Sequence, residues 1–226
     1  MDTELFESIV KQVQPLTHML CLHVMGEPMY HPELEPFLEI CEKHKMNISL
    51  VTNGVLLNDS NQALLLSPAI AQVNFSLQSF EANYIGMDNK SYLDKIFNFT
   101  KRAFAERPDM HINYRLWNAG SFVECLEKNK LTIQRIQEAF GLSYETIKGI
   151  SNLGNRLVNN LFLNLSENFD WPTMGMPFRS KAGTCRAMIN QVAILCDGTV
   201  VPCCFDCEGV IKLGDANVEP IVDILN

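Results

Sequence analysis

The sequence predicts an α/β fold, a partial (β/α) barrel with a parallel sheet, followed by a small cysteine-rich β-hairpin extension. Apolar runs typical of strands alternate with helical segments, which indicates βαβ units. The strands are apolar almost throughout, as expected when both faces of a sheet are covered. Five such strands are too few for a closed eight-stranded barrel. Near the carboxyl end, an Asp-Gly pair between two apolar runs predicts the hairpin.

The first half of the chain alternates helical and strand segments. An opening helix carries Leu5, Phe6, Ile9 and Val13 at helical spacing and is closed by Pro15. The expected strands here are 16–24, 47–52 and 73–77, and the expected helices between them are 33–44 and about 60–66.

The second half continues the same alternation and then changes composition. The expected helices are 90–107, 132–140 and 144–153, and the expected strands are 112–117 and 160–166. Residues 169–183 (FDWPTMGMPFRSKAG) are rich in Pro, Gly and Met and lack periodicity, so they predict a linker or an active-site loop. We therefore expect a barrel core over 1–168 and an extension over 169–226, whose hairpin strands are 191–195 and 199–203.

Composition limits the class of function. Of 226 residues, 47% are hydrophobic and 19% charged, which is ordinary for a globular protein and argues against a disordered chain. The net charge of −8 offers no basic surface for nucleic acid. The sequence has neither a run long enough to span a membrane nor a signal peptide, so we expect a cytoplasmic protein. Thiols stay reduced there, and clustered cysteines then indicate metal or redox chemistry.

Polar residues follow successive strands. Gly26 and Glu27 come after the first strand, Asn53 after the second, while Ser76 and Arg115 lie on the third and fourth. Each has an ordinary explanation by itself, as a loop, a turn or a solvent-facing side chain. Together they occupy corresponding places, and ligands of α/β sheets bind at the carboxyl ends of strands.

The segments MGEP (25–28), TNG (52–54) and SLQSF (76–80) resemble the radical S-adenosylmethionine (SAM) superfamily. The resemblance implies that Gly26 and Glu27 bind the amino group of the methionine moiety of SAM. It also assigns Asn53 to the cofactor site, and Ser76 and Arg115 to the ribose or carboxylate. Met25 departs from the GGEP that is commonest in the family.

The cysteines near the carboxyl end resemble a second family element. Twelve residues separate Cys185 from Gly198, and four more precede Cys203, which is the opening of the SPASM extension; LGD at 213–215 is also similar to it. The resemblance implies an auxiliary 4Fe–4S cluster with Cys185 and Cys203 as ligands, and Cys204 and Cys207 as candidates for a further site. Structural zinc stays open as an alternative, because Cys₄ sites form from similar hairpins.

The remaining cysteines lie in less specific surroundings. Cys196 opens the hairpin turn and is either a ligand or a small hydrophobe. Cys21, Cys41 and Cys125 lie in apolar strand or helix segments and are expected in the core.

One element of the superfamily does not occur in the sequence, namely the CxxxCxxC loop that holds the SAM-binding cluster. We therefore expect a fragment or a degenerate homologue, and no reductive cleavage of SAM by this polypeptide alone. The intact protein would carry out 5′-deoxyadenosyl-radical chemistry on a peptide, protein or small-molecule substrate, with a reducing partner such as flavodoxin or ferredoxin. The first barrel strand is expected to be missing as well, so the exposed sheet edge predicts self-association.

Two other functions stay open. The chain is alternatively a non-catalytic, zinc-stabilised α/β binding module. A third possibility is an α/β enzyme without radical chemistry, in which MGEP and TNG are plain loops.

Overall fold

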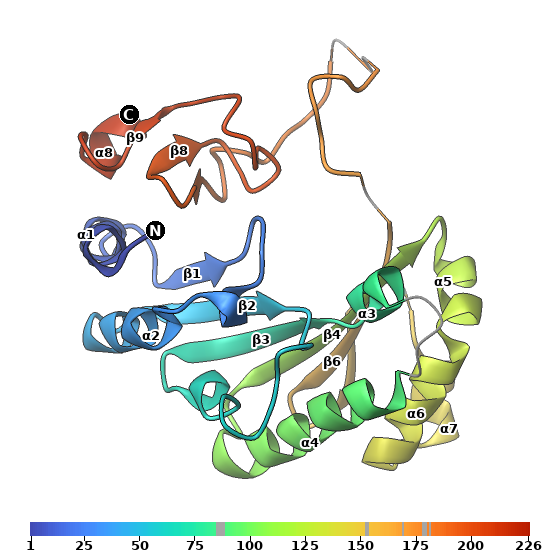
Figure 1. The fold of residues 1–226 in the computed structure, drawn as a ribbon. Helices are drawn as coiled ribbons and strands as arrows, with labels where there is room; N and C mark the ends of the chain where they lie inside the picture. The colour runs from blue at the N-terminus through green and yellow to red at the C-terminus, as the bar shows by residue number, and fades with distance from the viewer. Residues whose placement is uncertain (85–88, 152–153, 169, 178–179, 181) are drawn as a thin grey trace.

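The computed structural model describes residues 1–84, 89–151, 154–168, 170–177, 180 and 182–226. Its body is a six-stranded sheet in the order β1-β2-β3-β4-β6-β5 (Figure 1). Strands β1, β2, β3, β4 and β6 pair in parallel, and β5 pairs antiparallel with β6. The strands are β1 (Met19–Leu22), β2 (Asn47–Thr52), β3 (Ile70–Ser76), β4 (His111–Ala119), β5 (Asn155–Val158) and β6 (Leu161–Glu167). The predicted α/β class with a parallel sheet is confirmed, and the described residues form no closed barrel.

Helices join most of the parallel strands, as in βαβ units, and further helices lie before the first strand and after the last. They are α1 (Thr3–Val13), α2 (Leu34–Lys43), α3 (Gln78–Asn83), α4 (Lys90–Glu106), α5 (Phe122–Lys128), α6 (Lys130–Phe140), α7 (Tyr144–Lys148) and α8 (Ile221–Ile224), with 3₁₀ turns η1 (Pro28–Tyr30) and η2 (Leu64–Leu66). Across the described ranges, every helix is too short or too polar to cross a membrane.

The two faces of the sheet differ in chemistry. Along β4, Ile112, Tyr114 and Leu116 are buried, and the hydroxyl of Tyr114 lies 2.6 Å from that of Thr100 on α4. Successive side chains of a strand point to opposite faces, so the half-buried residues Asn113, Arg115 and Trp117 lie on the face away from α4. We call this face the open face; it carries Cys21, Ser49, Asn74, Asn113, Arg115, Trp117 and Asn164.

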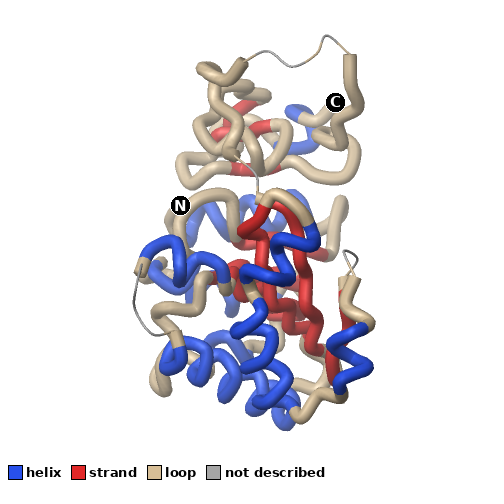
Figure 2. The backbone as a smooth tube through the Cα atoms, turned by 90° about the vertical axis from the view of Figure 1, so that its right-hand side faces the viewer, coloured by secondary structure: helices blue, strands red, loops and turns tan. Residues whose placement is uncertain are grey.

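The carboxyl-terminal part forms a second sheet in the order β7-β8-β9, with β7 (Ala193–Ile194), β8 (Thr199–Val201) and β9 (Gly214–Asp215). The Asp197–Gly198 turn joins β7 to β8, as predicted, and Gly198 has φ +93°, a conformation that favours glycine. We call residues 185–226 the tail; it lies beyond β1 in Figures 1 and 2. Buried Ile221 on α8 fixes the tail to α1, because its backbone N–H donates to Oε1 of Gln12 (2.8 Å).

Several predicted elements differ in extent. The strand expected over 16–24 is confined to β1, and the helix expected over 60–66 is only the turn η2. In that segment, Oδ1 of Asn58 accepts bonds from the backbone N–H groups of Ser60 and Asn61, which satisfies the backbone in a turn instead of a helix.

The helix expected over 144–153 ends at Lys148, and Gly149 follows it. Residues 152–153 of that helix, and 169, 178–179 and 181 of the expected linker, lie outside the described residues. The predicted domain boundary at 168/169 stays a prediction.

Candidate functional site

Glu27 joins the loops that follow β1 and β2. The backbone N–H of Met29 donates to Oε1 of Glu27 (3.1 Å), and the backbone N–H of Asn53 donates to Oε2 (2.8 Å). Each carboxylate oxygen can accept more than one bond, so the half-buried carboxylate keeps acceptor capacity for a cationic ligand. Gly26 precedes it with φ +90°, and a Cβ built there would meet no atom within 4 Å, so only the backbone conformation favours glycine here.

The loop after β2 is fixed from three sides. Oδ1 of Asn53 accepts a bond from the backbone N–H of Val55 (2.8 Å), and its carbonyl accepts a bond from the hydroxyl of Tyr92 (2.7 Å). Burial raises the pKa of Tyr92, and the negative charge of Glu27 raises it further, so Tyr92 stays a neutral donor. Gly54 has φ +72°, and an added Cβ would lie 2.9 Å from Cδ1 of Ile96. The loop therefore presents Glu27 in a defined orientation.

A polar network crosses the open face at Asn74, which is fully buried. Its Nδ2 donates to the carbonyl of Leu50 (3.2 Å), which can only accept, and this fixes the orientation of the amide. Oδ1 of Asn74 consequently faces β4, where it accepts bonds from Asn113 Nδ2 (3.2 Å) and Arg115 Nη2 (2.9 Å). Gln72 Nε2 donates to the same oxygen (2.7 Å). The network orients the polar side chains of β4.

Arg115 is the cationic group of the open face. Its guanidinium lies over the Trp117 ring, 4.9 Å from the ring centroid, and its buried Nε has no hydrogen-bond partner among the described residues. Burial lowers the pKa of Arg115, but an arginine side chain still carries its charge at neutral pH. Ser76 is half-buried at the end of β3 and pairs in register with Arg115. This pair suits an anionic or hydroxyl-bearing ligand.

The five predicted cofactor-site residues thus lie on neighbouring strands of the sheet or in the loops that follow them. Gly26, Glu27 and Asn53 lie at the carboxyl ends of β1 and β2, and Ser76 and Arg115 lie side by side on β3 and β4. Their assignment to a ligand stays a prediction.

The predicted metal-site cysteines lie on two segments of the tail that contact each other. The backbone N–H of Met188 donates to the carbonyl of Pro202 (3.3 Å), so the segment that carries Cys185 lies against the loop that carries Cys203. Nε2 of Gln191 lies 3.9 Å from Sγ of Cys204. Strand β8 ends at Val201, before the adjacent cysteines Cys203 and Cys204. The alternation of side chains in a strand therefore does not set these two thiols on opposite sides.

These thiols fit an iron–sulfur cluster in donor chemistry and in the proximity of their loops. All eight cysteines are free thiols; Cys185 is exposed, and Cys203, Cys204 and Cys207 are half-buried. Within the described ranges, no three His, Cys, Asp or Glu side chains already stand close enough to hold one metal ion. Holding a cluster therefore requires the thiols to rearrange.

The expectation for Cys21 is wrong, whereas Cys41 and Cys125 are buried as expected. Cys21 is exposed because β1 is an edge strand and the residue lies on the open face. Cys196 is exposed as well.

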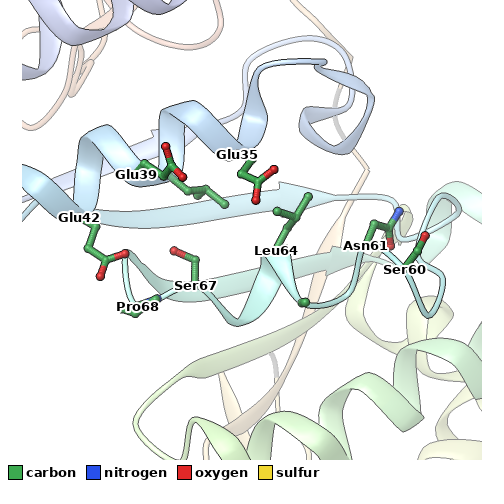
Figure 3. Close-up of a pocket in the computed structure, with 10 residues that line it drawn as sticks. Glu35, Glu39, Glu42, Ser60, Asn61, Leu64, Ser67 and Pro68 are labelled. Atoms are coloured by element: carbon green, nitrogen blue, oxygen red, sulfur yellow. The ribbon is translucent and has the colours of Figure 1, made fainter.

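Two cavities flank the sheet. One, of about 1390 Å³, lies between β1 and the tail, and its lining includes Cys21, Glu27, Cys204 and Cys207. The other, of about 410 Å³, lies between α2 and the segment 60–68; its carboxylates are Glu35, Glu39 and Glu42 of α2 (Figure 3). None of the predicted site residues lines the smaller cavity.

Sequence reasoning missed Asn74, Tyr92 and Trp117. Asn74 and Trp117 lie on strands in which every second residue is polar or aromatic, and this alternation is the signal that indicates an open face. Tyr92 lies in the buried stripe of α4, where nothing in the sequence distinguishes it from a core aromatic residue.

Comparison with known proteins supports both parts of the molecule. Residues 185–226 match the model of SPASM, an iron–sulfur cluster-binding domain. No curated protein sequence matches the chain significantly.

Solved structures of radical SAM enzymes share the fold. BtrN in complex with AdoMet and 2-DOIA superposes with TM-score 0.58 at 15% identity, over 100% of this chain and 70% of BtrN. SuiB from Streptococcus suis gives 0.61 at 18% identity, over 100% of this chain and 59% of SuiB. The protein anSMEcpe with bound AdoMet gives 0.61 at 17% identity, over 100% of this chain and 72% of that one. The chain thus spans less than two thirds of SuiB.

Proposed function

We propose that this chain, which has the fold of radical SAM enzymes and a SPASM domain, is the core of an enzyme that binds SAM and an auxiliary 4Fe–4S cluster. The observation that carries the proposal is the fixed carboxylate of Glu27 at the carboxyl ends of β1 and β2, on the same sheet as the Ser76–Arg115 pair. An acceptor and a cationic donor on one sheet suit a zwitterionic amino acid moiety.

The residues of the chain have separate tasks in this proposal. Glu27 accepts hydrogen bonds from the ammonium group of the methionine moiety, and the loop containing Asn53 and Gly54 holds Glu27 in place. Arg115 and Ser76 contact the carboxylate or the ribose. Asn74 is a positioning residue, because it orients Arg115 through a single oxygen.

The tail holds the auxiliary cluster through Cys185 and Cys203, with Cys204 and Cys207 as further ligands. A bound cluster of this kind supplies one-electron chemistry. Because thiolate ligands require reduced cysteines, we assign the protein to the cytoplasm. We propose a peptide or a small molecule as the substrate. Two proteins of similar structure support this class, because SuiB binds the precursor peptide SuiA and BtrN binds 2-DOIA. A flavodoxin or ferredoxin is proposed as the reducing partner.

Two measurements test the proposal separately. The first is anaerobic reconstitution with iron and sulfide, followed by metal analysis and the visible absorbance of the cluster. Cys185→Ala and Cys203→Ala should each lower the bound iron, whereas Cys41→Ala, a fully buried position in α2, should not. Stoichiometric zinc without iron in protein purified anaerobically would contradict the cluster.

The second measurement is calorimetric titration with SAM. Glu27→Gln should weaken binding, because the ammonium group loses a charged acceptor. Glu39→Gln makes the same charge change at an exposed position of α2 and should leave the affinity unchanged. Equal affinities of the two variants would remove Glu27 from the proposed site.

A further inference from the structure

Two asparagines of the open face, Asn113 on β4 and Asn164 on β6, carry amide groups that have no task in the proposed function. Strand β4 lies between β3 and β6 (Figure 1), and Asn164 pairs in register with Arg115, one row of side chains from Asn113. The two asparagines are therefore diagonal neighbours on adjacent strands, roughly 8 Å apart at their Cα atoms. Both side chains are half-buried.

The orientation of the Asn164 amide is fixed by Trp117. Nε1 of Trp117 donates to Oδ1 of Asn164 (2.9 Å), and an indole nitrogen can only donate. The amide oxygen is therefore taken, and Nδ2 is turned away from Trp117. This nitrogen has no hydrogen-bond partner among the described residues, and it is not shut off from solvent. Asn164 thus presents a free NH₂ donor on the open face.

The amide of Asn113 is fixed as well, and it presents an acceptor. Nδ2 of Asn113 donates to Oδ1 of Asn74 (3.2 Å), whose own orientation is set by the carbonyl of Leu50. Oδ1 of Asn113 is consequently turned away from β3, and it is a buried acceptor without a partner in the part of the chain that the structure describes. Native proteins rarely leave such an acceptor unsatisfied. A ligand N–H group that displaces the side chains covering this oxygen would satisfy it.

A donor beside an acceptor complements an amide group. The carbonyl of a ligand amide would accept from Asn164, and its N–H would donate to Asn113. Two hydrogen bonds of about 3 Å, with one amide between them, are long enough to join the two asparagines. Aromatic rings flank the pair, because Trp117 contacts Asn164, and Phe162 pairs in register with Asn113. The site therefore offers both amide-binding groups and apolar surface.

The charge of the open face limits the ligand further. The five parallel strands, which the structure describes completely, contain one Asp or Glu, namely Glu167 at the end of β6. The alternation of side chains places Glu167 on the side opposite to Asn164. A ligand with an ammonium group would therefore meet Arg115 and no carboxylate on this face of the strands, whereas an uncharged amide is not repelled.

The pair lies beside the residues assigned to SAM and not among them. Glu27 follows β1, and β6 lies four positions from β1 in the sheet. This separation is roughly 19 Å along the sheet. The amino acid moiety of SAM is much shorter, so it does not reach Asn164 while Glu27 binds its ammonium group.

From the two fixed amides, the aromatic flanks and the charge, we infer that Asn113 and Asn164 bind the substrate, and that the substrate is uncharged at this site and carries an amide group. The inference rests on the proposed function, because it names the substrate class for the same open face. Peptide bonds and carboxamide side chains share this chemistry, and the test separates them.

The probes are N-acetylalanine N-methylamide, which has peptide-like amides, and propionamide, a primary carboxamide. Alanine N-methylamide is the control for charge, because it lacks the acetyl group and carries an ammonium group at neutral pH. Heteronuclear NMR of the full chain, with and without SAM, follows the side-chain NH₂ signal of Asn164. An amide probe should shift this signal saturably, and the ammonium compound should bind roughly tenfold more weakly or worse. Tighter binding of N-acetylalanine N-methylamide assigns the site to peptide bonds, and tighter binding of propionamide assigns it to carboxamide side chains.

Three variants locate the contact, and backbone signals of β4 and β6 report binding where a side-chain signal is lost. Asn164→Asp keeps an acceptor for Trp117 but replaces the NH₂ donor by an oxygen, so it should weaken amide binding roughly tenfold or more. Asn226→Asp makes the same charge change at an exposed position outside the sheet and should bind as the wild type does. Asn113→Leu removes the acceptor at similar volume and should weaken binding as well.

The same spectra check that each variant is folded. If Asn164→Asp does not fold, Asn113→Leu and the ammonium compound decide the result. Equal binding by Asn164→Asp and Asn226→Asp, equal binding of the ammonium compound and the amide probes, or no saturable shift of the Asn164 signal in either condition would overturn the inference. Displacement of the amide probe by SAM would overturn it too, because the adenine edge, which also has a donor beside an acceptor, would then occupy the pair. A chain that binds the amide probe at Asn164 but does not bind SAM contradicts the proposed function and not this site.

Discussion

Glu27→Gln should destabilise the fold as well as weaken SAM binding, because the carboxylate has a structural task. It accepts one backbone N–H on each oxygen, from Met29 at 3.1 Å and from Asn53 at 2.8 Å. A glutamine amide places an NH₂ group where one of these two oxygens stood, so the backbone N–H at that position loses its acceptor. The shorter bond to Asn53 should persist, and the N–H of Met29 should lose its acceptor and face a donor.

The size of the effect follows from this geometry. A hydrogen bond to a charged group contributes about 1.5–3 kcal/mol net, so one lost bond should lower the free energy of unfolding by about 2 kcal/mol. For a domain of this length, the melting temperature changes by about 2–4 °C per kcal/mol, which gives a decrease of roughly 4–8 °C.

Thermal unfolding followed by circular dichroism measures the decrease, with Glu39→Gln as the control for the change in charge. Amide hydrogen exchange should in addition be faster at Met29 in Glu27→Gln. If the two variants melt within about 1 °C of each other, well below the expected change, Glu27 does not clamp the two loops and the reasoning is wrong.

Three further predictions concern the scaffold. Gly54→Ala should cost about 3 kcal/mol in urea unfolding, because Gly54 has φ +72° and the new Cβ would lie 2.9 Å from Ile96. Tyr114→Phe should cost about 1 kcal/mol, since the phenol loses its bond to Thr100 while the Thr100 hydroxyl keeps its bond to a backbone carbonyl. Hydrogen bonds to Lys43, and then to His44, lower the pKa of Glu7 from 4.5 to about 2. The stabilising contribution of the Glu7 carboxylate is therefore present above pH 4.5 and is lost as the pH falls towards 2. Over this pH range, the melting temperature of the wild type should approach that of Glu7→Gln.

Each of these predictions has a result that contradicts it. Gly141 has φ +61° but open space around an added Cβ, so Gly141→Ala should cost only the backbone strain, about 1–2 kcal/mol; an equal cost at Gly54 would show that the contact with Ile96 has no effect. An unchanged free energy in Tyr114→Phe would show that the buried hydroxyl contributes nothing net. Parallel melting curves of wild type and Glu7→Gln down to pH 2 would remove the ion-pair cluster as a source of acid sensitivity.

Long periodic segments could be predicted from the sequence closely. The helix expected over 90–107 is α4 (Lys90–Glu106), because its apolar stripe is long and faces a sheet. The hairpin at 197–198 was also predictable, since an Asp-Gly turn depends only on local chemistry. Helix α5 was overlooked although Ser121 and Glu124 form a capping pair, in which the Ser121 hydroxyl accepts the N–H of Glu124.

Properties that depend on the arrangement of strands could not be predicted in this way. The exposure of Cys21 follows from the edge position of β1. The order of strands in a sheet cannot be predicted from a local sequence pattern. The role of Asn74 depends on contacts with two neighbouring strands, β2 and β4. The predicted site residues lie together because parallel strands end at one edge of a sheet, whereas the full ligand set of the tail cysteines depends on loops with no periodicity.

The hydrogen bond from the backbone N–H of Ile221 to Gln12 joins the tail to the first helix, and buried Ile221 belongs to α8, which contacts α1. Thermodynamic linkage follows, because whatever stabilises the tail also stabilises the first helix. Loading the tail with a metal centre should slow amide exchange in α1 and raise the midpoint of one cooperative melting transition. Stripping the centre with a chelator should loosen the amino-terminal helix, far along the chain from any cysteine of the tail.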